Sequence, residues 1–397
     1  HSWYRRQRQM CIRDRCIINH NYYKFRIMSK DHRTLIKKIH QSDYKFCISL
    51  SGGGTNLASS LLSVPGASNS ILEVFVPYSR ESIQIFLNKI PDHYCSLETT
   101  LNMASMSFKK TQELTKENHD KDVKIFGIGI TASLKTIDKK KGGHRFYIVS
   151  HNAEQTTLIS CNLQNNMRSR IEEEELLSEM ILKLIANNCN IKTDFPEIPE
   201  GFKIHTTEAE PLWSDLLANK LDFVSNTKNK PELIFPGSFN PLHEGHKKMK
   251  TIAEEKTGMD LFYEICIKNV DKPPLTFYQI KKTISQFDSN QWVLTTKGRF
   301  FEKAKLFPNS IFVIGFDTLN RMLDEKYYAS KKDMLEKLDV FNDFNNSFLV
   351  FGRKDLNVFR SMKDISIPSH IKKRFSGFGE KEFRDDVSSS ALRKKYL

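Results

Sequence analysis

The 397-residue chain lacks several features that would at once assign it to a common class. No apolar run approaches the ~18–20 residues of a membrane-spanning helix, so an integral helical membrane protein is excluded. Its seven cysteines are scattered and form no Cys-x-x-Cys pair, so we expect neither a disulfide framework nor a structural zinc site. A reducing compartment is the simplest location for such a chain. Internal repeats and nucleic-acid-binding motifs are also missing, so nucleic acid is not the expected partner.

Acidic residues are scarce at the start of the chain. The net charge is +14, and residues 1–27 contribute +6 of it because Asp14 is their single acid. We interpret residues 1–27 as a non-native or presequence-like basic tail, with Met28 as a natural start. A mitochondrial presequence is the alternative, since such segments are Arg-rich and acid-poor. The body of the chain is expected to be cytoplasmic, with the nucleus also compatible, and mitochondrial only if the tail is native. Its positive charge suits an enzyme of anionic nucleotides.

Two segments alternate short apolar strands with amphipathic helices, which predicts a two-domain α/β protein. The first domain is expected over residues 28–190, with strands at 45–50, 123–130 and 145–150 and a strong helix at 172–188. A Pro- and Gly-rich stretch opens an interdomain connection over 191–231, within which 211–221 is expected to be helical.

The second domain is expected over residues 232–397. Five apolar strands separated by helices predict a Rossmann-like, doubly wound parallel sheet, in which ligands bind beyond the carboxyl ends of the strands. The expected strands are 233–239, 261–268, 292–296, 310–316 and 347–352, and the expected helices are 245–256, 277–287, 299–306 and 331–341.

The most informative stretch is Phe-Pro-Gly-Ser-Phe-Asn-Pro-Leu-His-Glu-Gly-His at 235–246. A buried strand ends in a glycine turn, and a helix begins near His243, where backbone N–H groups can hold phosphate. The imidazoles of His243 and His246 are three residues apart and should point to the same side. They could donate hydrogen bonds to phosphate or be surface residues. A zinc protease would need His-Glu-x-x-His and a Walker A loop would need Gly-Lys-Ser/Thr, and neither occurs.

A second anion-binding pattern lies near the C-terminus. Ser388, Ser389 and Ser390 precede Arg393 by about one helical turn. Serines at a helix N-terminus followed by an arginine make an anion site, although the serines could also be plain helix caps.

These two motifs resemble the signature of the HxGH nucleotidylyltransferase superfamily, with Ser390 in place of a family threonine. The likeness covers about residues 232–397 and is best to the nicotinamide-mononucleotide adenylyltransferases. It implies catalytic roles for His243, His246 and Arg393. The nucleotide site that it implies consists of Gly237, Ser238, Phe239, Asn240, Gly315, Asp317, Arg353, Ser388, Ser389 and Ser390, and the mononucleotide site of Asn269, Asp271 and Lys272.

The resemblance implies transfer of AMP from ATP to nicotinamide or nicotinate mononucleotide. The acceptor phosphate is already anionic, so positioning and charge neutralisation should provide most of the catalysis. Mg²⁺ is expected with ATP, without a dedicated metal cluster on the protein. A cytidylyltransferase acting on a phosphorylated alcohol, or a non-catalytic nucleotide-binding protein, stays open. The sequence leaves ATP or CTP, the amidated or acidic acceptor, and a homo-oligomer undecided.

The first domain resembles the CinA C-terminal, nicotinamide-nucleotide amidohydrolase family over about residues 31–190. The likeness rests on the glycine run at 52–54, the Ser-Val-Pro-Gly-Ala-Ser stretch at 63–68 and the Gly-Ile-Gly-Ile-Thr segment at 127–131. Ile48 stands where the family has Glu, so the amidase-like site is expected to be degenerate, because a serine with no neighbouring acid or base is a poor nucleophile. The candidate residues are Ser49, Ser51, Gly52, Gly53 and Thr131.

Overall fold

The computed structural model describes residues 29–116, 123–137, 142–269, 271–355, 358–384 and 392–393. The expected basic tail, 1–27, and the serines Ser388, Ser389 and Ser390 lie outside the described residues. Within the described parts of the chain, no helix is both long enough and apolar enough to cross a membrane.

The first domain is built on a sheet of six described strands in the order β2-β1-β3-β4-β5-β6. β1 pairs in parallel with β2 and β3, and the remaining pairs are antiparallel. Three of its strands and its helix α6 lie where the sequence predicts them. Its elements are α2 (Lys30–His40), β1 (Tyr44–Ser51), α3 (Thr55–Leu62), β2 (Ile71–Phe75), α4 (Arg80–Leu87), α5 (Leu97–Thr115), β3 (Lys124–Ser133), β4 (His144–Asn152), β5 (Gln155–Leu163), α6 (Arg170–Asn188) and β6 (Lys203–Glu208).

The second domain is built on a sheet of seven described strands in the order β15-β12-β11-β8-β9-β10-β7. Every neighbouring pair is parallel except β10 with β7. Its elements are α7 (Pro211–Leu217), β7 (Phe223–Ser225), β8 (Leu233–Pro236), α8 (Glu244–Thr257), β9 (Leu261–Cys266), α9 (Phe277–Ile284), β10 (Gln291–Thr295), α10 (Phe300–Leu306), β11 (Ile311–Gly315), α11 (Phe316–Met322), α12 (Lys331–Asp343), β12 (Ser347–Phe351), β13 (Arg353–Asp355), β14 (Val358–Arg360) and β15 (Phe375–Phe378).

The doubly wound α/β architecture expected for the second domain is confirmed, but its sheet is wider than five strands. The two added strands, β7 and β15, are short and lie at opposite edges, where the sequence carries little periodic signal. The segment 191–231, expected as an interdomain connection, supplies a strand to each sheet. β6 pairs with β5 of the first sheet, and β7 pairs with β10 of the second.

Successive side chains along a strand point to opposite faces of the sheet, and in the second domain both sets are apolar, so helices cover both faces. In β8, Leu233 and Phe235 join one buried cluster while Ile234 joins the cluster on the opposite face. Helices α7, α8 and α9 contribute to the first cluster, and α10, α11 and α12 contribute to the second. The order β11-β8-β9 places the switch point of the topology beside β8, so a ligand site is expected at the end of that strand.

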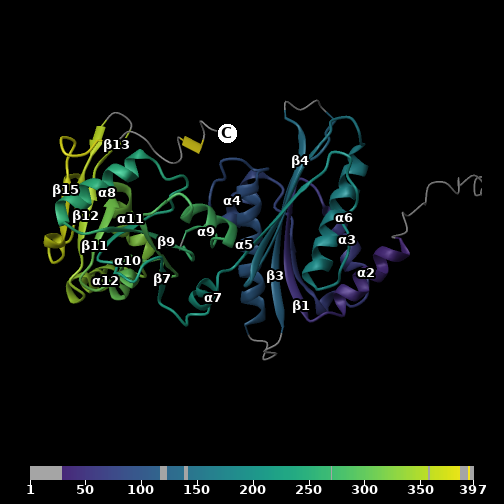
Figure 1. The fold of residues 1–397 in the computed structure, drawn as a ribbon, viewed down its shortest axis with the longest axis horizontal. Coiled ribbons are helices and arrows are strands. Elements are labelled where there is room, and N and C mark those ends of the chain that lie inside the picture. The colour runs from purple at the N-terminus through teal and green to yellow at the C-terminus, as the bar shows by residue number, and fades with distance from the viewer. Residues whose placement is uncertain are drawn as a thin grey trace, which may run out of the picture.

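Helix α9 of the second domain packs against the first domain, as Figure 1 shows between α5 and β9. The Phe277 backbone N–H donates to Thr156 Oγ1 over 3.1 Å, and Gln279 Nε2 donates to Glu98 Oε1 over 3.0 Å. His151 is buried here between Phe108 and Phe277, and burial lowers its pKa to about 4. The joint between the domains is therefore a packed interface that contains specific hydrogen bonds.

Candidate functional site

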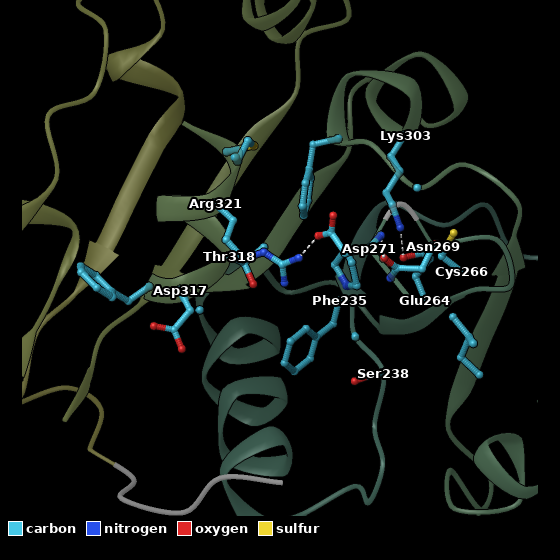
Figure 2. Close-up of a pocket in the computed structure, with 18 of the residues that line it drawn as sticks. Phe235, Ser238, Glu264, Cys266, Asn269, Asp271, Lys303, Asp317, Thr318 and Arg321 are labelled. Carbon is cyan, nitrogen blue, oxygen red and sulfur yellow. Dashed lines mark hydrogen bonds and ion pairs between the residues drawn. The ribbon is translucent and has the colours of Figure 1, made fainter. Parts of the chain in front are cut away.

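A cavity of about 490 Å³ opens beyond the carboxyl ends of the strands in the second domain (Figure 2). Its lining comes from β8, α8, β9, α10, β11, α11, β12, β13 and the loops between them. Of the residues expected from the sequence, the described ones that line it are Gly237, Ser238, His243, His246, Asn269, Asp271, Lys272, Gly315, Asp317 and Arg353. The fold thus gathers residues from four separate segments of the chain around one space.

The loop after β8 is fixed by an aromatic side chain that turns back into the core. Phe239 has a left-handed backbone (φ 40°), and its buried ring packs on Phe235, Tyr263 and Phe287. A side chain on Gly237 would collide with that ring, which explains the glycine. Phe239 therefore anchors the loop from beneath, and neither it nor Asn240 belongs to the described lining of the cavity.

The two histidines stack at the start of α8. His243 is the N-cap residue, and its ring centroid lies 3.7 Å from that of His246. The His243 backbone N–H donates to His246 Nδ1 over 3.3 Å. Because Nδ1 accepts, this geometry assigns the ring proton of neutral His246 to Nε2. The pair thus lines the cavity at a helix N-terminus, where the dipole favours an anion.

The segment after β9 is shaped by its own polar groups. The Asp271 backbone N–H donates to Asn269 Oδ1 over 3.1 Å, which is a turn stabilised by an asparagine side chain. The Asp271 carboxylate pairs with Arg321, and Figure 2 shows this contact in the middle of the pocket. Arg321 itself also lines the cavity.

Lys272 stands in a cluster of positive charge. Desolvation lowers the pKa of its ammonium, and the nearby cations Lys89, Arg321 and Arg393 lower it further. Like charges held together in this way favour an anionic ligand, because its arrival relieves their mutual repulsion.

The opposite side of the cavity carries Asp317 and Arg353, which follow β11 and β12 along the chain. The Asp317 carboxylate lies at the start of α11 and pairs with the Arg353 guanidinium, and both side chains are exposed. Figure 2 shows Asp317 on the far side of the pocket from Glu264 and Lys303. The polar residue Asp317 therefore lies on one side of the pocket, and Glu264 and Lys303 lie on the other (Figure 2).

Arg393 connects three segments of the chain. Its Nε donates to Asp92 Oδ2 over 2.5 Å, and its Nη1 donates to the carbonyl of Asn240 over 2.6 Å. Asp92 belongs to the first domain, so a residue of the C-terminal motif is held between the loop after β8 and the other domain. Asn88 of the same segment as Asp92 donates to the Asp271 carbonyl over 3.5 Å.

The sequence reasoning missed a buried polar group in the cavity wall. Glu264 lies in β9 and accepts hydrogen bonds from Thr295 of β10 and Lys303 of α10. All three side chains are buried, and Glu264 and Lys303 line the cavity. One signal was available, since Glu264 is a lone acid within the apolar strand Leu-Phe-Tyr-Glu-Ile-Cys.

The candidate site of the first domain has a different character. Ser49 is fully buried, and its hydroxyl donates to backbone carbonyls of Met103 and Ile128 and accepts from Ser107. These contacts are those of a core hydroxyl. Thr131, the register partner of Ser51, is also buried and shares a hydrogen bond of 2.7 Å with Thr100.

The glycine loop of that domain is filled by its own side chains. Arg170 Nη2 donates to the Gly52 carbonyl over 3.1 Å. Glu174 Oε1 accepts from Thr55 Oγ1 and from the Asn56 backbone N–H, at the start of α3. A β-carbon on Gly53 would contact Leu134 and Glu174. The position where a helix N-terminus would bind a ligand anion is therefore taken by Glu174.

Comparison with known proteins connects the second domain to a family. The cytidylyltransferase-like family model matches residues 234–395. A putative nicotinamide mononucleotide adenylyltransferase of Schizosaccharomyces pombe is 30% identical over 117 residues, which cover 26% of this chain and 46% of that protein. The chain thus spans about half the length of this curated relative.

Distant structural neighbours belong to the CinA group. A competence/damage inducible protein of Agrobacterium tumefaciens has 13% identity and a TM-score of 0.30, and the match covers 42% of this chain and 95% of that one. A CinA superfamily protein of Escherichia coli has 13% identity and a TM-score of 0.31, with 42% and 94% covered. At these scores the likeness supports no functional argument. The family match of the second domain does, and it identifies residues 234–395 as a cytidylyltransferase-like domain.

Proposed function

We propose that the second domain transfers AMP from ATP to nicotinamide or nicotinate mononucleotide, giving an NAD-type dinucleotide and pyrophosphate. The observation that carries the proposal is that one cavity holds the stacked histidines together with two separate polar groups. One flank of the cavity carries Asp317 and Arg353, and the other carries Asn269, Asp271 and Lys272. A reaction that joins two nucleotides needs a phosphate-binding centre with a nucleotide site on either side. The similarity to a putative nicotinamide mononucleotide adenylyltransferase of Schizosaccharomyces pombe supports the choice of acceptor.

The chemistry requires little beyond positioning. An oxygen of the acceptor phosphate forms a bond to the α-phosphorus of ATP, and the bond from that phosphorus to the bridging oxygen breaks, so that pyrophosphate leaves. No proton has to be removed from an ionised phosphate. We assign His243 and His246 as donors to the phosphate oxygens on which charge increases, with Nε2–H of His246 facing the substrate.

The flanks then have distinct roles. We assign Asp317, Arg353 and Arg393 to the nucleoside triphosphate, and Asn269, Asp271 and Lys272 to the mononucleotide. We propose that Mg²⁺ enters bound to the triphosphate as part of the substrate, held by phosphate oxygens and water. Within the described ranges, no group of three or more His, Cys, Asp or Glu side chains is arranged to hold a metal ion.

We also propose that the first domain does not hydrolyse the amide of the mononucleotide. The buried Ser49 hydroxyl and the Glu174 carboxylate at the start of α3 support this reading. Ammonia release from nicotinamide mononucleotide, measured with the full chain and with Ser49→Ala, is the test. Robust release by the full chain that Ser49→Ala abolishes would contradict the proposal.

Product analysis tests the transfer itself. The full chain is incubated with Mg²⁺ and either ATP or CTP, together with a panel of acceptors that contains both pyridine mononucleotides and several phosphorylated alcohols. Dinucleotide and pyrophosphate in equal amounts, formed with ATP and a pyridine mononucleotide, are the expected result. Faster reaction with CTP and a phosphorylated alcohol would favour the cytidylyltransferase alternative. A sample without acceptor controls for hydrolysis of the triphosphate.

A further inference from the structure

The buried pair Glu264–Lys303 is an unusual element of a cavity wall. Glu264 is 0% exposed and Lys303 is 3% exposed, and the Thr295 hydroxyl completes the group. Burying an ion pair gives little net stability, and well-packed apolar residues of similar volume often do as well or better. Its occurrence where a substrate cavity meets the core therefore needs a reason other than stability.

The pair sits close to the phosphate centre but on one flank of it. Glu264 is the register partner of Pro236, the last residue of β8, and its carbonyl accepts from the Gly237 backbone N–H over 3.0 Å. β9, which carries Glu264, lies on the opposite side of β8 from β11, and Asp317 follows β11 at the start of α11. This is the flank that we assign to the mononucleotide.

An aromatic surface adjoins the pair. Phe300 lines the same cavity and lies one turn before Lys303 on α10, so the two side chains share a helix face. A planar base that packs on this ring would bring its polar substituent toward Lys303 and Glu264.

We propose that Glu264 and Lys303 form the selectivity element for the acceptor base and favour the amidated pyridine mononucleotide over the acidic one. The inference rests on the proposed transfer reaction. A carboxamide complements the pair, because its NH₂ can donate to Glu264 and its oxygen can accept from Lys303. A carboxylate offers Glu264 no donor, and it brings a second negative charge beside a desolvated one, which is strongly unfavourable.

The test is the ratio of kcat/KM for the amidated acceptor to kcat/KM for the acidic acceptor, measured on one preparation of the full chain. The ratio does not depend on the fraction of folded protein, because both values scale with it. We expect a ratio of at least about 10 for the unchanged chain, on the scale of one misplaced polar group in a binding site. In Glu264→Gln the repulsion is removed and Lys303 attracts a carboxylate, so the ratio should fall at least about tenfold.

Two further variants complete the design. The double variant E264M/K303M replaces the pair by apolar side chains of similar length, so it tests the proposal even if Glu264→Gln fails to fold, and its ratio should approach 1. Glu254→Gln is the matched control, since Glu254 pairs with Lys250 over 2.5 Å in the same domain but does not line the cavity. Its ratio should stay within about twofold of the parent.

The outcomes separate the two proposals. If the unchanged chain forms dinucleotide with neither pyridine mononucleotide, the proposed reaction fails. If it forms dinucleotide with both at similar efficiency, or if Glu264→Gln lowers both efficiencies equally and leaves the ratio unchanged, the reaction stands and the selectivity role is wrong.

Discussion

We assign the central chemical role to the stacked histidines. His246 accepts a backbone hydrogen bond at Nδ1, so the ring proton of the neutral imidazole is on Nε2, and the residue lines the cavity. A residue oriented in this way can stabilise charge without reorganising when the charge develops.

His246→Ala should therefore lower kcat roughly 10²–10³-fold, as expected for the loss of one preorganised donor. The KM for the mononucleotide should change little, because its assigned contacts lie after β9. Steady-state kinetics with each substrate varied separately is the measurement. His370→Ala is a suitable control, since His370 pairs with Asp339 and is not part of the described cavity lining. A loss of less than about threefold in His246→Ala would mean that the pair is structural.

Helix α5 packs very closely against strand β3 in the first domain. The glycines of the Gly-Ile-Gly segment, Gly127 and Gly129, face the backbone of α5, and a β-carbon on either would collide with it. In the sequence these glycines belong to a segment that resembles the CinA family, and the structure shows that both lie in a helix–strand contact.

Gly129→Ala should destabilise the chain by about 3 kcal/mol, the upper end of the usual effect of overpacking, because rigid backbone atoms of Thr100 and Ala104 leave the methyl group no room. Thermal unfolding of the full chain measures this. Gly143→Ala is the matched control, since nothing lies within 4 Å of its added carbon. Equal melting temperatures for the two variants would contradict the packing argument.

A second contact between elements should respond to pH. Arg168 and Glu200 form a paired hydrogen bond of 2.5 and 3.0 Å that ties the segment before β6 to the loop before α6. The Arg168 guanidinium lowers the pKa of Glu200 to about 2.

Because the folded-state pKa is below the ordinary value of 4.5, the folded chain binds fewer protons than the unfolded chain between these values. The stabilisation is complete above about pH 4.5 and is lost as the pH falls toward 2. Glu200→Gln should therefore lose less stability than the parent between pH 6 and pH 3, as measured by urea unfolding at each pH. Parallel losses for both proteins would show that the pair does not contribute.

The two domains meet beside the proposed transferase site. Asp92 contacts Arg393 across the interface, and the segment that carries Asp271 is held by Asn88 and by the packing of α9. Through these contacts the first domain reaches the residues to which we assign nucleotide binding.

Asp92→Asn should lower the KM for the triphosphate about 2–5-fold, on the scale of one partly exposed ion pair. The amide keeps an acceptor for Arg393 but removes a negative charge that opposes the phosphates. The effect should disappear in the Arg393→Ala background, where the triphosphate KM is already raised, and a double-mutant cycle measures this coupling. A higher KM in Asp92→Asn would mean that the carboxylate orients Arg393 for the phosphates instead of competing with them.

Local sequence patterns were enough to predict the helices and strands of the second domain and to single out His243 and His246. Helices and strands of the second domain were predictable because their periodicity is written in neighbouring residues, and the loop at 235–246 identified both histidines. The topology then followed from general rules, since strands that alternate with helices form a doubly wound sheet whose ligands lie at the strand ends.

Contacts between residues far apart in the chain became visible in the tertiary structure alone. The pairs Glu264–Lys303, Arg321–Asp271 and Asp92–Arg393 join residues from 39 to 301 positions apart, so no local pattern specifies them. Burial likewise converted Ser49 from a candidate nucleophile into a core hydroxyl and Phe239 from a candidate ligand contact into an anchor. These outcomes depend on how strands and helices pack, because a side chain's solvent exposure and its partners are set by elements far away in the chain.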